Sequence, residues 1–175
     1  MPDIIYVNER DEEIGHGSIR EAILTGTIKR VVQIFLFNTK GDVLIAKRGA
    51  TAPFFPERWN ASTAGHVDVG ESYAHAAERE MQEEIGVSGV SLIEVGKAYM
   101  EEDIDGWMGK NFCTVYRGRY DGDIDTSSIE ISEARWIRPD ELEAWMAERP
   151  DDFTPTCRAG WQLVKTSKNV RDAIY

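Results

Sequence analysis

The chain has 175 residues, about the length of one average domain, and its 31 acidic and 20 basic residues give a net charge of −11. Its 42% hydrophobic and 29% charged residues are typical of a globular domain. The acidic balance argues against binding to nucleic acid or to a membrane surface, because both need basic patches. No apolar run approaches the roughly 20 residues that span a bilayer. Cys113 and Cys157 are too few for a disulfide scaffold, so we expect a reducing, cytoplasmic setting.

The first part of the chain predicts a short helix followed by a β-hairpin. Ser18, with Glu21 three residues later, forms a capping-box pattern that starts a helix. Residues 31–37 and 43–46 are apolar runs of β-forming residues. The polar residues 38–42 between them predict the turn that joins two strands.

The middle of the chain predicts an extended segment over residues 59–69 and then a helix over residues 72–85. Four apolar residues of this helix are spaced by three, four and four, which places them in one stripe facing the core. Gly86 ends the helix. The stripe consists of Ala74, Ala77, Met81 and Ile85.

Two more apolar segments, residues 90–100 and 112–120, predict strands. The connection between them, residues 101–110, is acidic at first and then contains glycines. Residues 134–137 predict a short strand, and Pro139 opens a helix from the first-turn position that proline favours.

Strands and helices interleave, but few helices are long enough for βαβ crossovers, so we expect an α/β sandwich with a mixed sheet. The whole chain, residues 1–175, is expected to form a single domain. Its core covers about residues 28–150, and residues 150–175 form a helical tail. Residues 1–27 either pack on the sheet as a small hairpin or cover the site.

Glu80, Glu83 and Glu84 lie three and four residues apart, so they share one face of the predicted helix. Two carboxylates 4 Å apart repel each other by about 4 kcal/mol at an effective dielectric constant of 20. A hard divalent cation such as Mg²⁺ relieves this repulsion and bridges to substrate phosphates. The alternative, a solvated acidic face, is the more common fate of three glutamates taken alone.

The surrounding spacing is much more specific than the three glutamates. Residues 65–87 fit the pattern Gly-x5-Glu-x7-Arg-Glu-apolar-x-Glu-Glu-x-Gly-apolar without a gap. Seven fixed residues, each at roughly 7% usage, give a chance match on the order of 10⁻⁸ per starting position. This pattern is the Nudix box, and the chain resembles a Nudix hydrolase, although Met81 stands where Ile, Leu or Val is commoner.

The resemblance implies an α/β/α sandwich and a Mg²⁺- or Mn²⁺-dependent hydrolase that cleaves a pyrophosphate bond in a small diphosphate metabolite. It also allows a homodimer. By this resemblance the metal ligands are Glu80, Glu83, Glu84 and the backbone carbonyl of Ala64. Glu71 and Arg79 form an ion pair that fixes the loop, while Gly65, Gly70 and Gly86 shape the backbone.

Residues 59–66 are also similar to type I isopentenyl-diphosphate isomerase, which shares this fold. That family has a cysteine immediately before the Gly-His pair, where this chain has Ala64. It also has a glutamate two residues before a later cysteine, where this chain has Asn111 before Cys113. Alanine cannot move a proton. The sequence therefore indicates an isomerase-like branch of Nudix hydrolases that lacks both proton-transfer groups.

The remaining roles stay open at the level of sequence. The general base is either Glu80 or Glu83 on the helix, or a glutamate outside the box. Substrate contacts are expected from Arg48, Phe55, Trp59 and His66, although a core or loop role is the alternative for each. An isomerase-type enzyme and a non-catalytic binding module are the alternative functions. The outside candidates for the base are Glu101, Glu102, Glu130 and Glu133.

Overall fold

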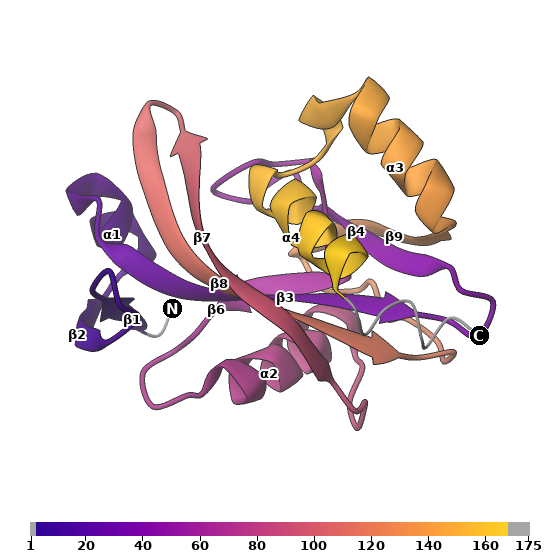
Figure 1. Ribbon diagram of the computed structural model, residues 1–175, viewed down its shortest axis with the longest axis horizontal. Helices are drawn as coiled ribbons and strands as arrows, with labels where there is room; N and C mark the ends of the chain where they lie inside the picture. Colours follow the sequence, from indigo (N-terminus) through magenta and orange to yellow (C-terminus); the bar gives the residue numbers. More distant parts are fainter. Residues whose placement is uncertain (1–2, 168–175) are drawn as a thin grey trace.

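A computed structural model describes residues 3–167, and the elements are labelled in Figure 1. The helices are α1 (Ile19–Thr25), α2 (Tyr73–Ile85), α3 (Pro139–Glu148) and α4 (Pro155–Thr166), with a 3₁₀ turn over Pro150–Asp152. The strands are β1 (Ile4–Val7), β2 (Glu13–Gly17), β3 (Ile28–Phe37), β4 (Val43–Arg48), β5 (Trp59–Asn60), β6 (Thr63–His66), β7 (Ile93–Ile104), β8 (Trp107–Arg119) and β9 (Ile131–Ile137). Residues 168–175 of the predicted tail lie outside the described residues.

Strand β3 is the centre of the sheet. It pairs in parallel with β8 along its whole length, and antiparallel with β1, β4 and β6. The α/β fold with a mixed sheet is therefore confirmed.

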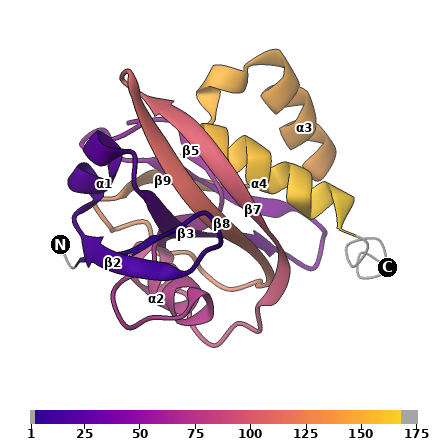
Figure 2. The same ribbon diagram turned by 60° about the vertical axis from the view of Figure 1, so that its left-hand side comes forward.

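Side chains that alternate along β3 separate two cores on the two faces of the sheet. Val32, Ile34 and Leu36 pack with the buried face of α2. Phe35 packs with buried residues of α3 and α4 on the other face. Figures 1 and 2 show α2 on one side of the sheet and α3 and α4 on the other.

The N-terminal residues form a hairpin that extends the sheet, since β1 pairs with both β2 and β3. Helix α1 follows, and the Ser18 side chain accepts a hydrogen bond from the backbone N–H of Glu21, which confirms the predicted cap. Asp11 ties this segment to the core, because its carboxylate lies 2.7 Å from Arg30 and 2.6 Å from Lys97.

Two sequence predictions are wrong in detail. Residues 101–110 are not an irregular connection, because β7 and β8 form one long hairpin. Its turn is Asp105–Gly106, where both residues have positive φ (53° and 87°), as in the favoured Asp-Gly hairpin turn. In α2 the exposed Ala74 does not belong to the buried stripe, and Ala76 takes its place.

Candidate active site

Helix α2 places the carboxylates of the motif and has a defined start and end. The Ser72 side chain accepts a hydrogen bond from the backbone N–H of His75, which caps the first turn. Gly86 ends the helix in the left-handed conformation (φ 68°), which glycine adopts without a steric cost. Glu80 and Glu84 are both buried on this helix, at 8% and 9% exposure, so they do not form a solvated acidic face.

Arg79 connects the helix to the loop that precedes it. Its guanidinium donates two hydrogen bonds to the Glu71 carboxylate, at 2.8 and 2.9 Å. It also donates to the backbone carbonyl of His66 at 2.9 Å and to Glu80 at 2.7 Å. A single side chain therefore fixes the loop and compensates part of the buried negative charge.

The strand before the loop passes directly against the carboxylates. The backbone N–H of Ala64 donates to Glu84 at 3.2 Å. A Cβ atom added to Gly65 would overlap the Glu80 carboxylate. Glycine is required here because the backbone and the carboxylate approach each other so closely.

Gly65→Ala should therefore displace the Glu80 side chain, whose end can move, without unfolding the protein. We expect kcat to fall about 100-fold, the typical effect of misplacing a functional group by 1 Å. Gly96→Ala in β7 is the matched control, because its nearest neighbour to an added Cβ is 4.0 Å away. Equal activity of the two variants would contradict this role of Gly65.

The buried carboxylates are poorly compensated. Burial raises the pKa of Glu80 to about 7, although Arg79 opposes the shift. Burial, together with the charge of Glu80, raises the pKa of Glu84 to about 8. A divalent cation would replace the missing positive charge, so the donor set fits a hard cation that prefers carboxylate and carbonyl oxygens.

Glu83 differs from its two neighbours. Its side chain is 59% exposed and lies 3.2 Å from the Arg79 guanidinium. Among residues 3–167, no three acidic, histidine or cysteine side chains already stand close enough together to hold a metal ion. Glu83 would have to leave Arg79 and turn inward to join a metal site.

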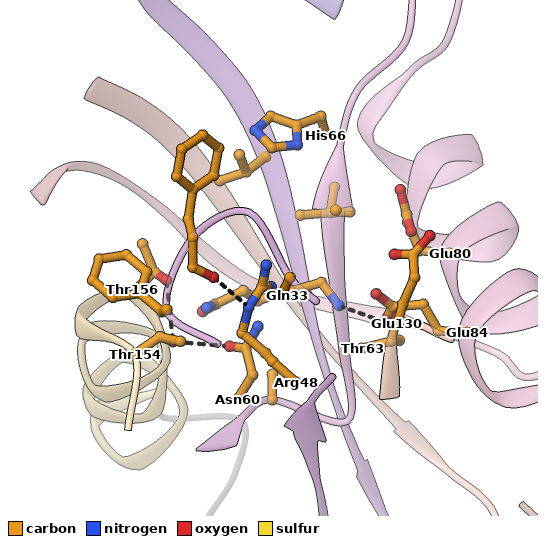
Figure 3. Close-up of a pocket in the computed structure, with 18 of the residues that line it drawn as sticks. Gln33, Arg48, Asn60, Thr63, His66, Glu80, Glu84, Glu130, Thr154 and Thr156 are labelled. Atoms are coloured by element: carbon orange, nitrogen blue, oxygen red, sulfur yellow. Dashed lines mark hydrogen bonds between the residues drawn. The ribbon is translucent and has the colours of Figure 1, made fainter. Parts of the chain in front are cut away.

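A cavity of about 470 Å³ opens beside these carboxylates. Figure 3 shows Glu80, Glu84 and Glu130 together on one side of it, with Thr154 and Thr156 on the opposite side. The hairpin and α1 also contribute to its wall, so the N-terminal segment both packs on the sheet and lines the site. Its contributions are Ile4, Ile19 and Ile23.

The chain matches a known protein family over most of its length. The NUDIX domain family matches residues 27–157, which is most of the chain. The chain belongs to the Nudix family.

Within residues 3–167, no helix has the length and apolar character needed to cross a membrane.

Its Nudix relatives include hydrolases and isomerases. An uncharacterized Nudix hydrolase, PA4841 of Pseudomonas aeruginosa, is 33% identical over 78% of this chain and 79% of its own length. An isopentenyl-diphosphate Δ-isomerase of Nocardia farcinica is 31% identical over 89% of each chain. The crystal structure of DR0079 from Deinococcus radiodurans superposes with a TM-score of 0.76 at 26% identity, over 95% of this chain and 99% of that one. The chain is thus a Nudix hydrolase of the isomerase-like branch.

The substrate contacts expected for this Nudix domain separate into two groups. Arg48, Phe55 and His66 line the cavity, and the Arg48 Nε donates to the backbone carbonyl of Phe54 at 3.0 Å. Trp59 is not among the lining residues. It is buried in the second core, where its ring lies 5.5 Å from that of Trp145.

Of the four candidate general bases outside the motif, only two lie at the cavity. Glu130 and Glu102 line the cavity, whereas Glu101 and Glu133 do not. Sequence reasoning missed Lys29 and Gln33, two polar residues of β3 that also line it. Their only signal was a pair of polar residues at even spacing in a strand whose other residues, apart from Arg30, are apolar.

Proposed function

We propose that this Nudix hydrolase cleaves a pyrophosphate bond of a small diphosphate metabolite and depends on Mg²⁺. The observation that carries the proposal is the pair of buried, undercompensated carboxylates, Glu80 and Glu84, at the edge of a 470 Å³ cavity. Such a pair favours a divalent cation over a second basic side chain, because a cation also attracts the substrate's phosphates.

Glu80, Glu84 and the Ala64 carbonyl would hold the cation, with Glu83 as a further ligand after it turns inward. When bound, Mg²⁺ neutralises phosphate oxygens and lowers the pKa of water. The chain's own residues orient the reaction. Arg79 and Glu71 keep the loop against the helix, and Arg48 offers a positive charge to the diphosphate inside the cavity.

Glu130 is the general base that the geometry favours. It lies beside Glu80 and Glu84 in the cavity, and its charge contributes to the raised pKa of both. In the proposed step its carboxylate accepts a proton from the attacking water as the new P–O bond forms. The bond to the bridging oxygen then breaks, and the leaving phosphate takes the electron pair. Glu80 and Glu83 have the weaker claim to this role, since Arg79 contacts both.

Glu130→Gln should lower kcat about 100- to 1,000-fold, as expected when a general base is removed. Mg²⁺ should still bind, because the proposed ligands Glu80, Glu84 and the Ala64 carbonyl remain. Glu133→Gln, an exposed neighbour on β9, is the matched control and should keep full activity. If both variants hydrolyse substrate at the wild-type rate, Glu130 is not the base.

An isomerase reaction fits this cavity less well. Ala64 and Asn111 both line it, at the positions where the resemblance places the isomerase cysteine and glutamate. Neither side chain transfers protons at neutral pH. The same cavity therefore offers metal-dependent hydrolysis without the groups that move a proton across a double bond.

A diphosphate panel tests the proposal. It contains nucleoside di- and triphosphates, dinucleotides, nucleotide sugars and prenyl diphosphates, each incubated with Mg²⁺, with Mn²⁺ or with a chelator. We expect hydrolysis of one class that the chelator abolishes. Turnover of none of the classes would favour the non-catalytic binding module instead.

A further inference from the structure

The cavity wall on β3 and β8 holds polar groups that the hydrolytic machinery does not use. Lys29 and Asn111 are 2% and 1% exposed, and both line the cavity. They are direct partners in the parallel pairing of β3 with β8, so their side chains lie on the same face of the sheet. Gln33, four residues after Lys29 on β3, shares that face and is 2% exposed. We call Lys29, Gln33 and Asn111 the polar wall.

The polar wall has unused hydrogen-bonding capacity. Among the described residues, the Lys29 Nζ, the Gln33 Oε1 and the Asn111 Oδ1 have no hydrogen-bond partner. Asn111 uses its other end, since its Nδ2 donates to the Glu102 carboxylate at 3.2 Å. This bond leaves the Oδ1 atom as a free acceptor, and the Lys29 Nζ is a free donor on the same face of the sheet. Burying such groups unpaired destabilises the protein, which suggests that a ligand pairs with them.

The charges of the wall indicate what this ligand is. Glu102 is the anionic neighbour of Lys29, and it raises the lysine pKa against the lowering effect of burial. Together with Glu102, which also lines the cavity, the wall therefore presents donors and acceptors without a large net charge. A hydrocarbon chain placed here would leave every one of them unpaired.

We propose that Lys29 and Asn111 bind the substrate moiety attached to the diphosphate, and that this moiety presents a hydrogen-bond acceptor and donor side by side. Sugar hydroxyls and the amide edge of a nucleobase both have this chemistry. A prenyl group does not, although relatives of this chain include isopentenyl-diphosphate isomerases. The inference rests on the proposed function, because it names the substrate class of the same cavity.

The test compares Lys29→Met, which keeps the length of the side chain and removes its charge, with the wild type. The substrates are UDP, ribose 5-diphosphate and isopentenyl diphosphate. We expect the wild type to prefer a polar substrate over isopentenyl diphosphate by at least about tenfold in kcat/KM. Lys29→Met should lose about 10- to 100-fold with that polar substrate, mainly through KM, as for the loss of a hydrogen bond to a charged group.

The two polar substrates distinguish the source of the shared chemistry. An equal loss with UDP and ribose 5-diphosphate assigns the wall to the sugar hydroxyls, and a loss with UDP alone assigns it to the base. Isopentenyl diphosphate should lose nothing in the variant. A wild type that prefers isopentenyl diphosphate, or an equal loss with all three substrates, would overturn the proposal.

Binding measurements separate this proposal from the hydrolase assignment. Methylene-bridged analogues of UDP and isopentenyl diphosphate are titrated calorimetrically, so no turnover is needed. Weaker binding of the UDP analogue by Lys29→Met supports the polar wall even if nothing is hydrolysed. Unchanged binding in an active enzyme overturns the polar wall alone.

Discussion

Glu84→Gln should lower kcat about 1,000-fold, because it removes the charge of a proposed metal ligand whose contribution to the transition state is several kcal/mol. The amide keeps the shape of the side chain and can still accept the hydrogen bond from the backbone N–H of Ala64. The variant should therefore fold as the wild type does. Steady-state kinetics on the substrate found with the panel, at saturating Mg²⁺, measures the effect.

Thermal unfolding provides the control for this variant. Mg²⁺ at 100 times its Kd stabilises a protein by about 2.7 kcal/mol, so the wild type should melt at a higher temperature when Mg²⁺ is added. Glu84→Gln should show little of this increase. Glu78→Gln, an exposed glutamate on the same helix, should behave as the wild type in both assays. A fully active Glu84→Gln would remove Glu84 from the site.

Arg79→Met should destabilise the protein by about 3 kcal/mol and abolish measurable activity. The substitution leaves Glu71 and Glu80 without the cation that contacts both, and removing one partner of a buried ion pair is strongly destabilising. Arg79→Lys should restore only part of the loss, because an ammonium group cannot donate two parallel hydrogen bonds to the Glu71 carboxylate. Urea denaturation measures the free energy of unfolding.

The matched control is Arg138→Met. Arg138 pairs with Asp140 at 2.7 Å, but both side chains are about two-thirds exposed. Exposed ion pairs contribute roughly 0 to 1 kcal/mol, so this variant should remain close to the wild type. If Arg79→Met is no less stable than Arg138→Met, the guanidinium does not hold the loop to the helix.

The sequence was sufficient to locate the motif and the helix that carries it, because both depend on local spacing. Termination at Gly86 follows from a local stop signal, and the shared face of the three glutamates follows from helical periodicity. The burial of Glu80 and Glu84 does not, since it depends on β6 passing directly over them at Gly65. Tertiary packing, not helical pattern, buries Glu80 and Glu84 and leaves Glu83 exposed on the same helix.

The polar wall could not be predicted from the sequence, because it also depends on tertiary packing. Lys29 and Asn111 are more than 80 residues apart, and only the parallel register of β3 and β8 makes them neighbours. Trp59 shows the converse. Its aromatic ring suggested a stacking contact with the substrate, whereas that ring packs against Trp145 in the second core. The β7–β8 hairpin turn could have been predicted from the sequence, because the Asp-Gly pair at Asp105–Gly106 is a strong hairpin signal.

We expect the buried carboxylates of α2 to exchange protons for a divalent cation. Calorimetric titration of the wild type with Mg²⁺ at pH 7.5, in buffers of different ionisation enthalpy, measures this exchange. Glu84, with a pKa raised to about 8, is mostly protonated at this pH, so each Mg²⁺ bound should release about one proton. The affinity should therefore increase as the pH rises from 6 to 8.5. Binding without proton release, or equal binding by Glu84→Gln, would show that Glu84 does not bind the cation.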